Sequence, residues 1–210
     1  MTAKRNDVLA AAQTFIQESN PKDEIFVLNF TDRVTRGLPG RMLFSDNIEQ
    51  LRSALYRGVP QGKTALNDAI VAGLQQLEQG RRDKKTLIVI SDGGDNASRH
   101  SRREMLDRVE RSIATIYSIG LQDPEDPERD PGILKKLAGI SGGEAYFPED
   151  ASSMTPVCHR IAKEIRSRYT IGYRPYSGRG SHSLRRLDVQ VSAPGHAKLT
   201  VRSRRSYRYE

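Results

Sequence analysis

The sequence predicts an α/β protein with a Rossmann-like, doubly wound, mostly parallel sheet flanked by helices, plus a small antiparallel β appendage at the carboxyl end. Strand-like and helix-like segments alternate as far as about residue 165, which is typical of a doubly wound sheet. The run Leu87–Ile90 is apolar at every position, as expected of a strand that is covered on both faces. Beyond residue 168 the apolar residues recur with a period of two, which indicates antiparallel strands.

The first half of the chain is expected to open on a helix and then to alternate. Val8, Ala11 and Phe15 recur at the spacing of one helix face, and the helix should end before Asn20-Pro21. The segments expected next are a strand over 24–30, a short strand over 41–44, a helix that Ser45 or Asp46 would cap and that contains Ile48, Leu51 and Leu55, a loop over 58–63 and a helix over 65–78.

The second half continues the alternation. Pro131 suits the first turn of a helix, and Gly142-Gly143 would end it. The acidic, proline-rich loop over 122–131 is expected to be a solvated connection, although its carboxylates leave Ca²⁺ binding open. The segments expected here are a strand over 87–91, a helix over 99–110 capped by Asn96 or Ser98, a strand over 113–121, a helix over 131–140, a strand over 145–147 and a helix containing Met154, Val157, Ile161 and Ile165.

The last quarter is expected to form the β appendage. Alternating apolar residues predict antiparallel strands over 169–173, 187–191 and 199–201, with a Gly/Ser-rich connection over 175–183. We therefore expect an α/β domain over 1–168 and a β extension over 169–210 that packs on it.

The net charge of +8 is unevenly distributed. Residues 1–159 contain 21 Lys and Arg against 23 Asp and Glu, whereas residues 160–210 contain 13 against 3. Such a basic tail is able to bind nucleic acid or an anionic surface. The alternative, a solvated strand face, is favoured because these arginines alternate with apolar residues, so a nucleic-acid partner is not the first expectation.

The sequence shows no membrane-spanning or secretory segment. No apolar run approaches membrane-spanning length, and the first residues lack an apolar signal stretch with a cleavage site. As written, the chain is expected to stay in the cytoplasm. Cys158 is the single cysteine, which excludes an internal disulfide.

The most informative stretch is the end of the predicted strand at Ser91, where Asp92, Gly93 and Gly94 follow an apolar run. In open α/β sheets, ligands bind beyond the carboxyl ends of such strands, and glycines permit tight turns there. An ordinary strand-to-helix turn is the alternative. The usual phosphate-loop, dinucleotide, metalloprotease, serine hydrolase and redox motifs are absent, so we expect a protein without enzymatic activity.

Several segments together resemble the von Willebrand factor type A domains, and in particular a bacterial branch with a similar C-terminal extension. The resemblance spans nearly the whole chain in the expected order. It is based on Asn20–Phe30, Gly62–Ile70, Ile90–Asn96, Ala114–Gly120, Ser141–Phe147 and Ile165–Pro175.

The resemblance implies a metal-ion-dependent adhesion site. In this family a D-x-S-x-S loop, a threonine and an aspartate hold a divalent cation, and a carboxylate of a protein partner completes its ligand shell. Thr64 matches the threonine and Asp92 the aspartate. Oxygen ligands with few carboxylates suit Mg²⁺ and leave it able to accept an acidic ligand. For Thr64 alone, a helix N-cap before Ala65 is the alternative.

The sequence departs from the family because D-x-S-x-S is absent. Met1 sits where a methionine commonly follows that motif, so we expect that the chain starts at an internal methionine and that the true product extends upstream. That upstream part would be able to contain a signal peptide, because members of the branch are often exported. The absent strand would lie in the middle of the sheet, so its neighbours should lack pairing, and Mg²⁺ binding by this chain should be weak or absent.

Overall fold

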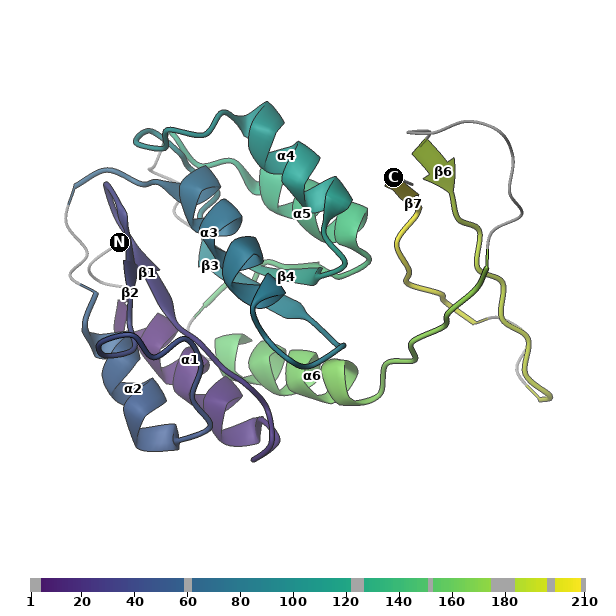
Figure 1. The fold of residues 1–210 in the computed structure, drawn as a ribbon, viewed down its shortest axis with the longest axis horizontal. Coiled ribbons are helices and arrows are strands. Elements are labelled where there is room, and N and C mark those ends of the chain that lie inside the picture. Colours follow the sequence, from purple (N-terminus) through teal and green to yellow (C-terminus); the bar gives the residue numbers. More distant parts are fainter. Residues whose placement is uncertain are drawn as a thin grey trace.

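The computed structural model describes residues 5–58, 62–121, 127–150, 153–174, 184–195 and 199–208 (Figure 1). Most of the acidic loop (122–126) and the predicted connection over 175–183 lie outside the described residues. The helices are α1 (Arg5–Glu18), α2 (Ile48–Tyr56), α3 (Leu66–Glu78), α4 (Arg102–Arg111), α5 (Pro131–Ser141) and α6 (Met154–Arg166). The strands are β1 (Leu28–Phe30), β2 (Val34–Arg36), β3 (Thr86–Ser91), β4 (Thr115–Gly120), β5 (Ala145–Tyr146), β6 (Leu184–Arg186) and β7 (Ser206–Arg208).

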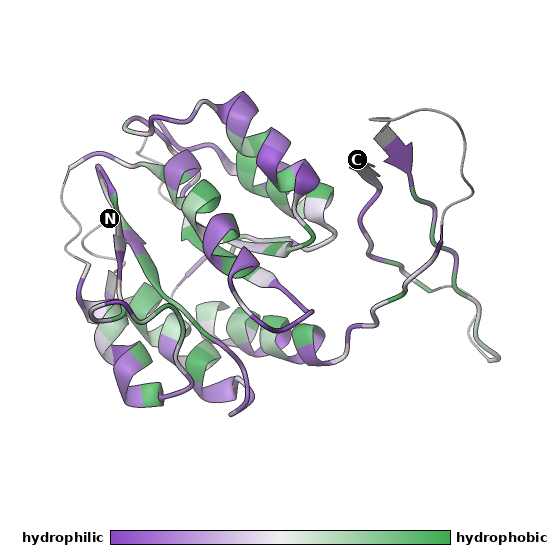
Figure 2. Cartoon of the chain, viewed as in Figure 1, coloured by the Kyte–Doolittle hydropathy of each residue, from purple (hydrophilic) through white to green (hydrophobic). Residues whose placement is uncertain are grey.

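A parallel sheet with strand order β3-β4-β5 forms the centre of the fold. Leu87 and Val89 of β3 pack with buried residues of α3, α4 and α5, whereas Ile88 and Ile90 pack with α1 and α6 on the other face. The helices in Figure 2 alternate between hydrophobic and hydrophilic residues, as expected of helices that pack one side on a sheet. The predicted doubly wound α/β fold, with β3 covered on both faces, is therefore confirmed.

The antiparallel pair β1–β2 forms a sheet separate from the parallel one in the described part of the chain. In β3, every second residue directs its backbone N–H and C=O groups toward β4. The residues between them, including Ile88 and Ile90, direct these groups to the opposite side of the strand, where no strand is paired among the described residues. By the same alternation, Leu28 and Phe30 of β1 direct theirs away from β2. Helix α3 contacts β1, β2 and β3 and bridges the two sheets. Among the described residues, β1 and β3 therefore each have one edge that pairs with no other strand.

Three predictions for residues 24–47 are wrong in detail. Only 28–30 of the expected strand 24–30 is regular, and the expected strand 41–44 is replaced by a single bridge between Ile25 and Ser45. Helix α2 is capped by Asn47, whose side chain accepts a hydrogen bond from the Gln50 backbone N–H at 3.0 Å, rather than by Ser45 or Asp46. Among the described residues, no strand pairs with 41–44, so this apolar segment does not become a strand. The sequence pattern of the segment contains no information on whether such a partner exists.

The later helices agree better with the sequence. Helix α5 has Pro131 in its first turn and ends at Gly142 in the left-handed conformation, and α6 spans the predicted residues. Helix α4 starts at Arg102, three residues later than expected, because Ser101 and Glu104 form a capping box. Asn96 and Ser98 are therefore not its caps. Every helix in the described ranges is too short or too polar to cross a membrane.

The appendage is antiparallel, as predicted, but its strands lie elsewhere. β6 pairs with β7 over three residues each, whereas 169–173, 187–191 and 199–201 form no regular strand. Tyr169 is 92% exposed and Ile171 73%. A segment with alternating apolar residues forms a strand only where another strand lies close enough to pair with it. In the described part of the tail this holds only for β6 and β7, and β7 contacts α4.

Candidate functional site

The candidate site lies where the ends of β1 and β3 approach the start of α3. The carbonyl of Thr31, just after β1, accepts a hydrogen bond from the Ala65 backbone N–H at 2.6 Å. The carbonyl of Thr64 accepts from the backbone N–H groups of Asn96 and Ala97 at 2.9 and 3.1 Å. The loop before α3 is thus held between the two strand ends, and the structure brings Thr64 against the loop that begins at Asp92.

Asp92 is 5% exposed at the end of β3. Its Oδ1 accepts from the Gly94 backbone N–H at 3.0 Å and from the Ser91 hydroxyl at 3.4 Å. Within the described residues, its Oδ2 receives no hydrogen-bond donor. A carboxylate oxygen that no protein donor occupies is a ligand of the kind that a divalent cation accepts. Asp92 is therefore suited to bind a cation.

The turn after Asp92 requires glycine at position 93. Gly93 has φ +92°, and a Cβ there would lie 2.1 Å from the carbonyl oxygen of Asp130. The Asp130 backbone N–H in turn donates to the carbonyl of Asp92 at 3.2 Å. The end of the acidic loop therefore packs directly on the aspartate turn.

Thr64 does not cap α3. The N-cap residue is Ala65, which makes no side-chain cap bond, so the alternative role for Thr64 is wrong. The Thr64 backbone N–H donates to Asn96 Oδ1 at 2.7 Å, and its half-buried hydroxyl has no partner in the described part of the chain. The hydroxyl remains available as a ligand.

The side chains that cap α3 come from residues 92–100, the loop after β3, which we call the aspartate loop. The sequence did not predict these caps. Asp95 Oδ1 accepts from the Asn67 backbone N–H at 3.3 Å, and Asp95 Oδ2 accepts from Asn67 Nδ2 at 2.7 Å. The Ser98 hydroxyl accepts from the Asp68 backbone N–H at 3.0 Å. The polar residues within 95–98 indicated a helix cap in the sequence. Because they lie shortly before the predicted helix over 99–110, they were assigned to that helix and not to the preceding helix α3.

Asp68 fastens the same loop from the other direction. Its carboxylate accepts from the backbone N–H groups of Arg99 and His100 at 3.0 and 2.9 Å and lies 2.6 Å from His100 Nδ1. Burial raises the pKa of Asp68, but these hydrogen bonds and the charge of His100 outweigh it, so the pKa is lowered overall. The aspartate loop is therefore pinned to the first turn of α3.

The donor set for a metal is incomplete in this chain. No group of three or more His, Cys, Asp or Glu side chains converges among the described residues. Thr64 and Asp92 offer one hydroxyl and one carboxylate, and Glu128 contacts the site indirectly by accepting a hydrogen bond from Asn96 Nδ2.

Comparisons with known proteins agree with the fold. Residues 1–94 match the family model of the von Willebrand factor type A domain. A von Willebrand factor type A structure from Catenulispora acidiphila is 16% identical with a TM-score of 0.65, covering 77% of this chain and 38% of its own. The conserved hypothetical protein BatB from Bacteroides thetaiotaomicron is 15% identical with a TM-score of 0.60, covering 78% of this chain and 89% of its own.

A third structure is relevant to the metal. Proximal thread matrix protein 1 from the mussel byssus, solved with a zinc-occupied MIDAS motif (metal-ion-dependent adhesion site), is 14% identical with a TM-score of 0.59, covering 79% of this chain and 43% of its own. The chain thus spans less than half of two of these three structures. None of the curated proteins compared with it matches.

Proposed function

Because this chain belongs to the von Willebrand factor type A family, we propose that it is a non-enzymatic protein-interaction module that binds its partner at Thr64 and Asp92. The partner's acidic group would bind a divalent cation, Mg²⁺, held by these two residues. The observation that supports this most is the position of the Asp92 carboxylate at the end of β3, where the Gly94 N–H holds Oδ1 and no donor among the described residues occupies Oδ2.

The two side chains fit such a cation chemically. Carboxylate and hydroxyl oxygens are hard ligands of the kind that Mg²⁺ prefers. Asp92 Oδ1 is held by the Gly94 N–H, so we expect Oδ2 to be the oxygen that binds the cation. Two ligands are only part of a six-oxygen shell, so we expect weak Mg²⁺ binding by this chain alone.

The absence of enzymatic activity is part of the proposal. The described residues contain no serine, threonine or cysteine that bonds to a histidine, and the paired His100 and Asp68 serve to hold a loop. A nucleophile with an adjacent base is the minimum for acyl transfer or hydrolysis by a side chain.

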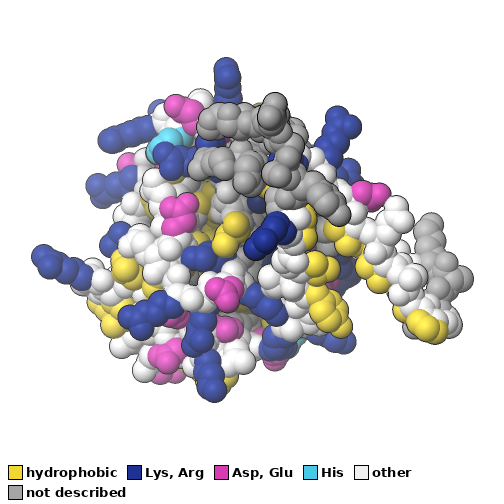
Figure 3. Space-filling model, turned by 45° about the vertical axis from the view of Figure 1, so that its right-hand side comes forward, with side chains coloured by type: hydrophobic (Ala, Val, Ile, Leu, Met, Phe, Trp, Pro, Cys, Tyr) yellow, Lys and Arg dark blue, Asp and Glu magenta, His cyan; other side chains and the backbone are white. Residues whose placement is uncertain are grey.

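The alternative function, binding of nucleic acid or an anionic surface by the basic tail, has less support. Figure 3 shows Lys and Arg side chains spread over the face that it displays, with hydrophobic side chains between them. Arg202 pairs with Glu144 and Glu164, and Arg204 donates to backbone carbonyls at the end of α4. These two arginines fasten residues 169–210 as an extension on the domain 1–168, which remains our proposed division.

Manganese titration followed by NMR tests the proposed site directly. Mn²⁺ accepts the same oxygen ligands as Mg²⁺ and broadens nearby amide signals even when it binds weakly. We expect the signals of Ala65 and Gly94 to broaden first, and excess Mg²⁺ to restore them. Asp92→Asn should abolish the broadening, whereas Asp83→Asn, at an exposed site after α3, should not. Broadening that is absent, or that survives Asp92→Asn, would contradict the proposal.

A further inference from the structure

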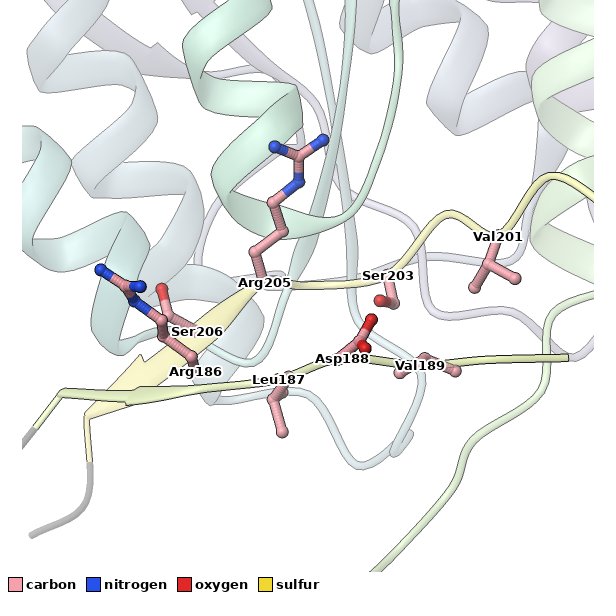
Figure 4. Close-up of a pocket in the computed structure, with 8 residues that line it drawn as sticks. All are labelled: Arg186, Leu187, Asp188, Val189, Val201, Ser203, Arg205 and Ser206. Atoms are coloured by element: carbon pink, nitrogen blue, oxygen red, sulfur yellow. The ribbon is translucent and has the colours of Figure 1, made fainter.

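The two halves of the appendage separate around a hollow just beyond β6 and β7. The last backbone hydrogen bond between them runs from the Leu187 N–H to the Arg205 carbonyl at 2.7 Å. Past this bond the segments 187–191 and 199–203 diverge around a cavity of ≈ 650 Å³ (Figure 4). Its lining includes the apolar side chains of Leu187, Val189 and Val201.

Both segments present unpaired backbone groups. In the described part of the tail, residues 188–193 and 199–204 make no backbone–backbone hydrogen bond. Apolar residues alternate along the first segment, and Val191 at its end is 54% exposed. Extended segments with free N–H and C=O groups are templates for another strand.

The tail arginines fall into two groups. Arg202 and Arg204 are occupied by glutamates and by carbonyls of α4, respectively. Arg186 and Arg205 line the hollow, are exposed, and have no carboxylate partner in the described residues. Figure 4 shows both guanidinium groups projecting to the same side of the two segments. Two arginines without a carboxylate partner in the described residues therefore flank an opening that is lined in part by apolar side chains.

We propose that this hollow binds an extended acidic peptide of a partner protein, which enters as a β-strand between residues 187–191 and 199–203. Its backbone pairs with the free groups of the two segments. Its apolar side chains contact Leu187, Val189 and Val201, and its carboxylates pair with Arg186 and Arg205. This surface is separate from the Thr64–Asp92 site and does not depend on a cation.

The chemistry favours a peptide over a nucleic acid or a second copy of this chain. A strand offers both N–H donors and C=O acceptors, whereas a nucleic-acid backbone offers acceptors to the protein and leaves the free carbonyls unpaired. A second copy would bring its own basic tail, with 13 Lys and Arg against 3 Asp and Glu from residue 160 onward, against the same charges.

Fluorescence anisotropy with labelled peptides tests the proposal on the full chain. The probe is an octapeptide of alternating Glu and Val, compared with the same peptide in Lys and Val and with one whose alternate backbone nitrogens are methylated. We expect the Glu–Val peptide alone to bind. The double variant Arg186→Gln/Arg205→Gln should weaken it at least about tenfold, because two charge-assisted contacts are lost. The matched control Arg33→Gln/Arg36→Gln, at exposed positions around β2, should leave the affinity unchanged.

Four results would overturn the proposal. These are no binding of the Glu–Val peptide, equal binding of the Lys–Val peptide, equal binding of the methylated peptide, and tighter binding of a single-stranded oligonucleotide that the same double variant abolishes. Circular dichroism of the double variant shows whether it is folded. If it is not, single charge-preserving variants, Arg186→Lys and Arg205→Lys, are expected to retain most of the affinity, and a complete loss in either would also overturn the proposal.

Discussion

Replacing Asp95 by alanine is expected to lower the midpoint of thermal unfolding by about 4 to 16 °C. Asp95 supplies from another loop the cap that α3 lacks, because Ala65 makes no cap bond. Losing an N-cap costs about 1 kcal/mol. The variant also leaves the buried Asn67 amide with the His100 carbonyl as its only acceptor in the described residues, and an unsatisfied buried donor costs about 1 to 3 kcal/mol.

The sum, about 2 to 4 kcal/mol, converts at about 2 to 4 °C per kcal/mol for a chain of this length. Circular dichroism at the helix band measures the transition. Asp83→Ala removes an exposed carboxylate outside the site and is the control. Asp95→Asn keeps one acceptor oxygen and should fall between the two. If Asp95→Ala unfolds at the temperature of Asp83→Ala, the loop is not the cap of α3 and the reasoning fails.

Three further predictions concern the tail, the aspartate turn and pH. Arg204→Lys should speed chymotryptic cleavage of the tail, because an ammonium group cannot span the three carbonyls that the guanidinium reaches, whereas Arg205→Lys should not. In urea unfolding, Gly93→Ala should lose about 2 kcal/mol or more through steric clash at positive φ, whereas Gly139→Ala, in open space on α5, should gain about 0.5 to 1 kcal/mol. The pKa of Asp68 is lowered from 3.8 in the folded state, so its contribution to stability is present above that pH and is lost as the pH falls below it; Asp68→Asn should flatten the acid limb of urea unfolding measured against pH.

The parts of the fold that the sequence predicted well are those whose pattern is long and locally determined. Helices α3, α5 and α6 show apolar faces over several turns, and β3 is apolar on both faces. The tail strands and the strand over 41–44 were misplaced because a short alternating pattern becomes a strand only beside a partner at the right distance. The sequence of a short segment does not show how far it lies from a possible partner strand.

The site divides in the same way. Asp92 follows from the apolar run and the two glycines, since such a strand end is recognisable in sequence. The caps that Asp95 and Ser98 supply to α3 do not follow, because they join residues about 30 positions apart. Both residue types favour a cap, and only the packing of the loop decides which helix receives it.

The two proposed surfaces lie at opposite ends of the parallel strands, which makes them separable. Asp92 is at the carboxyl end of β3, whereas Arg204 fastens the appendage to the end of α4, just before β4 begins. The described residues contain no hydrogen bond or ion pair that joins the aspartate loop to the tail. Variants at sites that are distant and share no partner are expected to add. Combining Asp92→Asn with Arg186→Gln/Arg205→Gln should therefore remove Mn²⁺ broadening and peptide binding each to the same extent as the separate variants. An interaction between the two effects would mean that the tail and the aspartate loop act on one ligand.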